Sequence, residues 1–374
     1  MRAHRQRGVS LVELMVAVVI AIITVLVVLE VLATYEARKR TTTIGNDAEI
    51  SAATGLFALE RDVRMAGAGL TLPNSFACNV GVNLFFGAAG TFSDGAVLAP
   101  LRIIDGGAGP DQIRVIRSDA NFGPAPATIV TSMAAADSNV LVDWNGGLAR
   151  GDLFLAGSPD GNKICTVMQL TRAPQASGSG FSLEHSSANP ANHNPASPGT
   201  AFTTAIRYDV GDTVTNLGTF GLRTYAVLCG NGAAPGLDNA CNLVSFNTLA
   251  VPAPTLANVE SISTQVVDLQ AQYGVAPANS QTVDAWVDAT LDPLTGVNWA
   301  APTALNLRRI KAVRLAIVTR GNLEREMVSP ATLVLWDRGL ATERTIALNN
   351  DQRRYRYKVL TVVVPLINVI WAGV

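Results

Sequence analysis

The sequence predicts an α+β fold in which one long N-terminal helix packs on an antiparallel, β-rich head domain. An apolar run from Val9 to Leu29 continues into helix-forming polar sequence with no proline before Pro73. From about residue 74, glycine, proline, serine and asparagine separate short β-branched runs, a pattern typical of strands. We therefore divide the chain into a leader (1–8), a membrane helix (9–29), an amphipathic continuation (30–69) and a head (74–374).

Composition narrows the classes of function. The chain has 374 residues, of which 48% are hydrophobic and 15% charged, so it can bury a large core. The formal net charge is −1, and the basic residues are spread along the chain. A general nucleic-acid binder would concentrate them in a stripe, so we expect no specific nucleic-acid partner.

The first 29 residues have the organisation of an exported, membrane-anchored protein. Residues 1–8 carry Arg2, Arg5 and Arg7 and no acid, which favours a cytoplasmic N-terminus. The 21 residues from Val9 to Leu29 span ~31 Å as a helix, about the thickness of a bilayer core. Glu13 is their only charged residue.

Three interpretations compete for this segment. A secretory signal peptide would have a shorter apolar run followed by a small-residue cleavage site, which is absent after Leu29. An ordinary signal anchor explains the length and the arginines but does not explain a charged residue at Glu13, unless its side chain reaches the membrane–water interface. The run Arg7-Gly8-Val9-Ser10-Leu11-Val12-Glu13-Leu14-Met15 resembles the processing site of type IV prepilins, which explains every feature together.

This resemblance implies specific roles for three residues. A prepilin peptidase would cut between Gly8 and Val9, leaving Val9 as an N-methylated first residue, although the family usually has phenylalanine there. Glu13 then becomes the family's acidic position. Its carboxylate can pair with the new α-amine of a neighbouring subunit, which offsets the desolvation of both charges and sets the axial stagger.

The helix is expected to continue beyond the membrane. Leu56, Leu59 and Val63 recur on one helical face, which would lie against the head. Gly67 and Gly69 are expected to end the helix. The weak helix formers around 41–46 predict a bend or a melted turn there.

Most of the head is predicted to form strands. The segment 258–273 is the exception, because its apolar residues follow a helical spacing. Loops are expected near 174–201, 230–240 and 276–306, with His185 and His193 exposed in the first of them. The run near the C-terminus contains Pro365, is too short to span a membrane and is predicted to be a buried terminal strand.

The head carries four widely spaced cysteines and no CxxC pair. Behind an export signal this number favours two disulfides in an oxidising compartment over reduced core cysteines or a zinc site. Four cysteines allow three pairings. Locality favours Cys229–Cys241, since the first residue ends one predicted strand and the second begins another.

Several blocks, in the same order along nearly the whole chain, resemble the PilW family of type IV minor pilins: 56–67, 151–155 before Cys165, 266–275, 310–320 and 354–359. Two features depart from the family: Cys78 lies further from the first block, and Ile367-Asn368 replaces an arginine-asparagine pair. The resemblance implies the pairs Cys78–Cys165 and Cys229–Cys241 and a pilin-like fold.

The family resemblance implies a structural subunit that primes pilus assembly, near the tip. Its expected partners are the prepilin peptidase, other minor pilins and the major pilin through the N-terminal helix, the inner-membrane assembly platform and membrane lipid. The chain would lie in the bacterial inner membrane with its head in the periplasm, and later in the pilus at the cell surface. The alternatives are a minor pseudopilin of type II secretion and a membrane-anchored binding protein or enzyme.

No catalytic constellation accompanies these features. The sequence has no HExxH, GxxxxGK[ST] or GxSxG motif, so we expect neither enzyme activity nor a cofactor. Asp284, Asp288 and Asp292 could suggest a calcium loop, but their spacing does not fit an EF-hand, and a solvated acidic loop is the simpler interpretation. We therefore predict no metal site.

Overall fold

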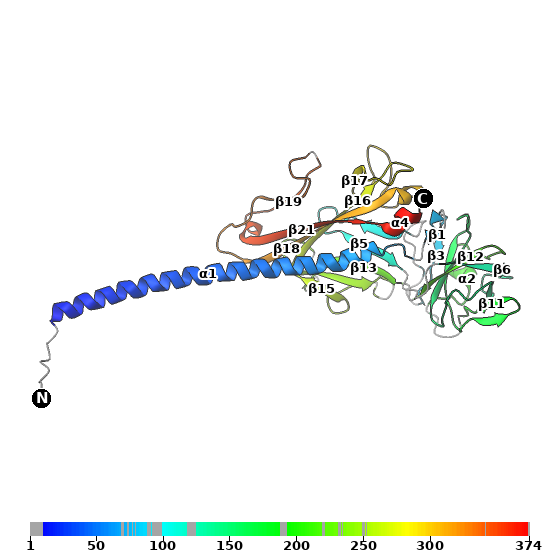
Figure 1. Ribbon diagram of the computed structural model, residues 1–374, viewed down its shortest axis with the longest axis horizontal. Helices are drawn as coiled ribbons and strands as arrows, with labels where there is room; N and C mark the ends of the chain where they lie inside the picture. Colours follow the sequence, from blue (N-terminus) through cyan, green and yellow to red (C-terminus); the bar gives the residue numbers. More distant parts are fainter. Residues whose placement is uncertain are drawn as a thin grey trace, which may run out of the picture.

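The computed structural model describes residues 10–68, 71–72, 75–76, 78, 80–87, 91, 99–117, 125–187, 193–218, 221–230, 233, 235–248, 251, 253–340 and 342–372. One long helix, α1 (Leu11–Arg64), projects from a β-rich head (Figure 1). The strands pair antiparallel except for the short β3–β9 pair. This is the α+β arrangement that the sequence predicts.

Helix α1 runs for 54 residues without interruption, so the helix does not melt near 41–46, which is one of the two forms predicted there. Threonine and glycine each cost a helix at most about 1 kcal/mol, which the hydrogen bonds of the flanking turns outweigh. Gly55 has a packing purpose in the half of α1 that lies on the head. A Cβ there would lie 3.0 Å from Leu243 Cδ2 and 3.2 Å from Ser263 Cβ, so glycine permits the close approach of helix and sheet.

The C-terminal half of α1 packs on two sheets, and we call this assembly the proximal unit. Its main core joins Leu59 and Val63 of α1 to the strands of both sheets. The five-stranded sheet has the order β15 (Glu260–Thr264), β14 (Cys241–Asn247), β13 (Gly221–Cys229), β5 (Gln112–Arg117) and β4 (Leu101–Ile104). The four-stranded sheet has the order β17 (Ala285–Val287), β16 (Val266–Val275), β18 (Ile310–Leu323) and β21 (Tyr355–Pro365).

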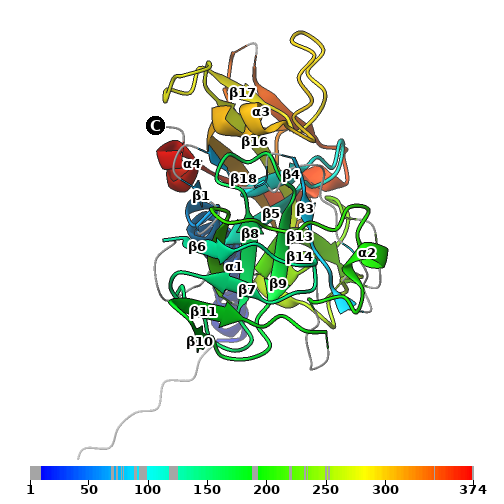
Figure 2. The ribbon, with the colours of Figure 1, turned by 90° about the vertical axis from the view of Figure 1, so that its right-hand side faces the viewer.

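A second β-rich region, residues 125–187 and 193–218, lies beyond the C-terminal end of α1, and we call it the distal lobe (Figure 1). Seen from that end, its strands lie in front of α1 (Figure 2). One of its cores is built only from residues between Ala127 and Val214. Its sheet has the order β10 (Gln175–Ser177), β11 (Gly180–Leu183), β7 (Val140–Val142), β6 (Ala127–Thr131), β12 (Thr213–Gly218), β8 (Leu153–Gly157), β9 (Cys165–Gln169) and β3 (Val82–Asn83).

The distal lobe is an insertion between two neighbouring strands of the proximal unit. Strands β5 and β13 pair directly, from Arg117 with Gly221 to Ile113 with Tyr225. All strands between them in the sequence, β6 to β12, belong to the distal sheet. The chain therefore leaves the proximal sheet at the end of β5 and returns beside the point where it left.

Two predicted elements take a different form. The segment 258–273 forms β15 and most of β16 instead of a helix. All ten residues of β16 are buried, and from Val267 to Val275 apolar residues alternate with Asp268, Gln270, Gln272 and Gly274. This period of two is typical of a strand, and the helical spacing of the apolar residues at 259–269 conceals it. The C-terminal run forms β21 and the short helix α4 (Ile367–Ala372). Most of β21 is half-buried or exposed, because it is the edge strand of its sheet.

The expected loops contain short elements. The segment 174–201 holds the hairpin β10–β11 and the one-turn helix α2 (Pro198–Ala201). The segment 276–306 holds β17 and the start of α3 (Ala304–Arg309), and the described residues of 230–240 contain no strand. The remaining elements are β1 (Thr71–Leu72) paired with β2 (Ser75–Phe76), β19 (Thr332–Trp336) paired with β20 (Arg344–Ala347), and the 3-10 helix Gln352–Arg354.

Both implied disulfides are present. Cys229 and Cys241 face each other across β13 and β14 and close a short hairpin within the proximal unit. Cys78 bonds Cys165 at the start of β9 and so ties the distal lobe to the chain that follows α1. The core around this second bridge includes Ile116 and Leu222 of the proximal sheet, which makes it the junction between the two regions.

Candidate assembly interface

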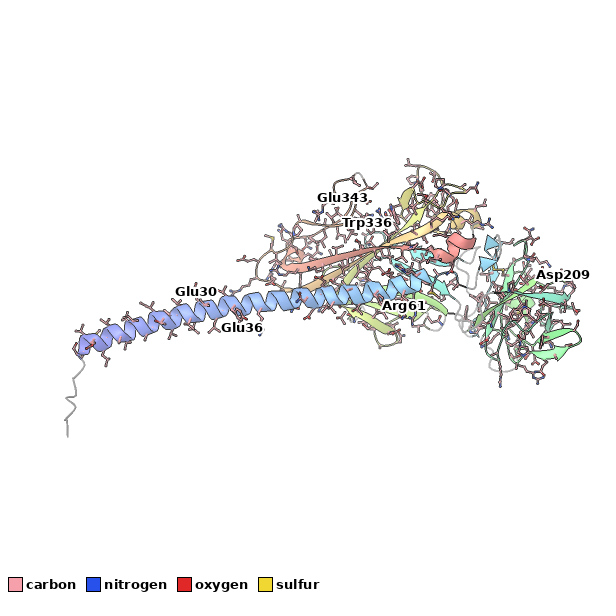
Figure 3. All side chains as sticks on the ribbon, in the orientation of Figure 1. Glu30, Glu36, Arg61, Asp209, Trp336 and Glu343 are labelled. Atoms are coloured by element: carbon pink, nitrogen blue, oxygen red, sulfur yellow. A yellow bond between two sulfur atoms is a disulfide. The ribbon has the colours of Figure 1, made fainter. Side chains whose placement is uncertain are left out.

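The N-terminal half of α1 has no partner within the described chain. Residues Leu11–Glu36 have a mean hydropathy of 3.1 in their most apolar window, and none of that window is buried. This segment is long and apolar enough to cross a membrane, and it extends away from the head (Figure 3). Glu30 and Glu36 lie near its C-terminal end, on the side of the head. Apolar side chains on every face of a helix require lipid or other helices around them.

The start of α1 lies at the predicted processing site. Ser10 is the N-cap in an extended conformation, and its side-chain oxygen accepts a hydrogen bond of 3.3 Å from the backbone N–H of Glu13. Glu13 is the acidic residue of the first turn, where a carboxylate interacts favourably with the helix dipole. Gly8 and Val9 lie outside the described residues. The structure therefore places Glu13 one turn after the expected cut.

Side-chain contacts hold α1 to the head just beyond the projecting segment. The Thr319 hydroxyl donates to the Ala48 carbonyl oxygen at 3.0 Å, and Lys358 pairs with Glu49 at 3.3 Å. On the other side of the helix, the Ser51 hydroxyl lies 2.7 Å from the Thr264 carbonyl oxygen, and Ser263 donates to the Ser51 carbonyl oxygen at 2.6 Å. Contacts to β15, β18 and β21 therefore fix both sides of α1 at the edge of the head.

A buried carboxylate forms a second attachment near the end of α1. Asp62 is 1% exposed, and its Oδ2 accepts a hydrogen bond of 2.8 Å from the Tyr225 hydroxyl on β13. Arg223 Nη1 lies 3.5 Å from the same oxygen. Burial, followed by the charge of Asp62, raises the pKa of Tyr225 well above its usual range, so the hydroxyl keeps the proton it donates. The pair links the helix to the middle of the proximal sheet.

Asp62 and Tyr225 are not among the residues that the sequence patterns predicted to have a role. A signal for Asp62 exists, because it lies three residues after Leu59 and directly before Val63, within the apolar face of α1. A charged residue on a buried face requires a partner. Nothing local in the sequence indicates that the partner is Tyr225, since the two residues are far apart along the chain.

The candidate calcium residues have separate roles. Asp288 accepts a hydrogen bond of 2.7 Å from Gln272, and Asp292 caps its own turn through Leu294 and Thr295. Within the described part of the chain, no group of three histidine, cysteine or acidic residues could hold a metal ion.

The prediction of two exposed histidines is wrong. His185 is 6% exposed and His193 is partly buried, and each has one ring nitrogen at a backbone carbonyl oxygen. Both side chains pack edge-on against phenylalanines, His185 on Phe154 and His193 on Phe86. The surrounding Gly, Ser, Asn and Pro residues predict a loop correctly, but they do not reveal that the loop folds back over an apolar core.

Two family matches agree with this geometry. Residues 3–29 match the prokaryotic N-terminal methylation motif, which covers the predicted cut and Glu13. The fold, the projecting apolar helix and this motif together define a type IV pilin-like protein. Residues 242–368 match PilW, the type IV pilus-assembly protein W. The resemblance to PilW is thereby confirmed for that segment, which runs from β14 to the start of α4 and lies in the proximal unit. No curated protein and no solved structure matches the chain.

Proposed function

We propose that this protein is a minor pilin, a structural subunit that is processed between Gly8 and Val9 and takes part in priming the assembly of a type IV pilus. In this proposal α1 anchors the chain in the inner membrane, with the head in the periplasm, and then moves into the filament among the helices of other pilins. The prepilin peptidase and the inner-membrane assembly platform are the partners before assembly.

The exposed apolar half of α1 carries the proposal. A membrane anchor needs only about 20 apolar residues, and nothing in its physics calls for a carboxylate in the first turn. An ionised residue within a membrane helix has a partner or a function in most cases. A neighbouring subunit's α-amine, exposed by cleavage before Val9, supplies such a partner for Glu13 when helices pack side by side.

The position of the distal lobe supports a place at the tip. In a filament that grows from the membrane, each new subunit enters below the last one, and the C-terminal end of α1 points towards the subunits that were added earlier. The distal lobe lies in that direction (Figure 1). A subunit with this lobe would obstruct one placed directly above it, whereas at the tip the lobe meets no neighbour. The lobe therefore favours a subunit that begins the filament over one repeated along it.

The test compares two carboxylates on the projecting helix. Glu13→Ala should leave processing intact but lower the amount of the protein in sheared pili by at least about tenfold, because the pairing in the apolar bundle is lost. Glu30→Ala is the matched control, since Glu30 lies on the same exposed helix near its polar end. Immunoblots of sheared filaments and of membranes measure both. Equal incorporation of Glu13→Ala and the parent would contradict the proposal.

A further inference from the structure

The distal lobe contains a cavity that the assembly role does not use. The cavity has a volume of about 180 Å³ and lies between the loop before β7, strand β9 and the segments around His185 and His193. The lobe is an insertion with its own core and lies at the end of the molecule opposite the membrane helix. An inserted region at that position is free to carry a function that α1 and the proximal unit do not need.

Hydrogen bonds of Asn194 fix part of the cavity wall. Asn194 is 5% exposed, and its side chain is fully engaged with β9 and the neighbouring segment. Its Oδ1 accepts from the Gln169 backbone N–H at 2.8 Å, and its Nδ2 donates to the carbonyl oxygens of Gln169 at 2.7 Å and of Ser186 at 3.2 Å. These bonds fix the position of Asn194, and with it the backbone of His193 and Pro195 on either side.

Both histidines that line the cavity have a defined tautomer. A carbonyl oxygen can only accept, so His185 Nε2 must donate to the Ser138 carbonyl oxygen at 2.8 Å, and His193 Nδ1 to that of Phe85 at 3.2 Å. Desolvation lowers the pKa of both imidazoles, despite the nearby Asp137 and Glu184 beside His185. Each ring is therefore neutral at pH 7 and keeps an acceptor lone pair on its second nitrogen.

The lining has one polar and one apolar part. Hydroxyl groups of Thr166, Ser186 and Ser187 accompany the two imidazoles. Apolar residues complete the wall: Met168, Pro195, Pro198, Phe202 and Ile206. A ring that carries hydroxyl groups on its edge and C–H groups on its faces matches both parts at once, since the imidazoles accept from hydroxyl groups and the apolar wall packs against the C–H face.

The charge of the lining excludes an anion. Among the described residues that line the cavity there is no lysine or arginine, and the one charged residue, Asp137, is an exposed carboxylate. A phosphate or carboxylate ligand would meet acceptors and a like charge. A buried cation would require a carboxylate within the cavity, whereas Asp137 is open to solvent. The class of ligand that fits this lining is therefore a neutral molecule rich in hydroxyl donors.

We propose that this cavity binds one neutral, hydroxyl-rich ring, a single sugar unit, and that the distal lobe is a carbohydrate-binding insertion. The proposal rests on the cavity and its lining and does not depend on the assembly role of α1.

The test uses the full chain in a zwitterionic detergent without a sugar headgroup, which removes competition from alkyl glycosides. Saturation-transfer NMR is recorded with free hexoses and N-acetylhexosamines, one at a time, and with inorganic phosphate and a primary amine for comparison. We expect saturable transfer to at least one sugar and none to phosphate. Transfer to none of the sugars, or to the amine alone, would overturn the proposal.

A matched pair of variants places the binding in the cavity. Ala136→Trp fills the cavity from its wall, whereas Ala135→Trp adds the same ring at an exposed neighbour that does not line it. We expect Ala136→Trp to weaken sugar binding by at least about tenfold and Ala135→Trp to leave it unchanged. His193→Gln, which keeps a donor for Phe85, provides a second variant should Ala136→Trp fail to fold. Equal sugar affinity in the parent, a folded cavity variant and the control would contradict the site.

Discussion

The proximal unit and the distal lobe differ in what holds them together and in what they resemble. The proximal unit is built around α1, and its core joins helix residues such as Leu59 to two sheets. It also contains the whole PilW match. The distal lobe has a core of its own and lies outside both family matches. The strands that pack most closely on α1 in the described part of the chain, β5, β15, β18 and β21, all belong to the proximal unit. The difference separates the part that carries the assembly helix from a part added at the far end.

Deletion of the distal lobe is the most drastic test of whether the proximal unit folds independently of it. Joining Arg117 to Gly221 by a short turn, with Cys78→Ser, should leave the proximal unit folded, because β5 and β13 are already paired neighbours. Ile116 and Leu222 pack in the core between the two regions and would become exposed to solvent, so both should be replaced by threonine. Circular dichroism and immunoblots of sheared pili should show a folded, incorporated protein.

The matching control keeps the lobe and carries only Ile116→Thr and Leu222→Thr. This control should be less stable than the parent, because polar hydroxyls then enter the junction core. Loss of the proximal fold in the lobe-deleted protein would mean that the two regions form one cooperative unit.

The second prediction concerns the attachment of α1 to the proximal sheet. Tyr225→Phe removes the donor to the buried Asp62 carboxylate and should lower the free energy of unfolding by about 2 kcal/mol. Tyr357→Phe is the control, since the buried Tyr357 hydroxyl has no hydrogen-bond partner among the described residues and its loss should change stability little. Urea unfolding followed by tryptophan fluorescence measures both. Equal effects of the two changes would show that the Asp62 contact contributes nothing.

The third prediction is that pH affects the two regions in opposite directions. In the proximal unit, burial raises the pKa of Asp111 from 3.8 to about 7, although the backbone N–H groups of Gly106 and Ala271 counteract it. The folded state then binds a proton that the unfolded state releases, so stability falls as pH rises from 5 to 7. In the distal lobe, burial lowers the pKa of His185 below 6.5, so stability is full above 6.5 and is lost as pH falls.

Hydrogen exchange, resolved by peptide, measures how the stability of each region changes with pH. Protection around the β4–β5 turn should fall by about 1 kcal/mol per pH unit between pH 5 and 7, while protection around His185 should rise. Asp111→Asn should flatten the first slope, and His185→Gln, which keeps a donor for Ser138, should flatten the second. Slopes of the same sign in both regions would contradict the assignment.

The sequence predicts the local features well and the long-range ones poorly. The helix, its apolar half and the Cys229–Cys241 pair follow from residues that are near one another in the chain. The strands at 258–273 are mistaken for a helix, because Val259, Ile262 and Val266 have a helical spacing, although the residues from Val267 onwards alternate between apolar and polar as a strand does. The insertion and the burial of His185 depend on contacts between distant segments, such as Arg117 with Gly221, that no local pattern records.

The central claim is that the chain becomes a filament subunit by processing before α1. Mass spectrometry of the N-terminal peptide, from cells that contain a prepilin peptidase, tests it most directly. The account predicts a mature chain that begins at an N-methylated Val9, two residues before α1 starts at Leu11. An intact leader, with Met1 or Arg2 still present in the mature protein, would contradict it.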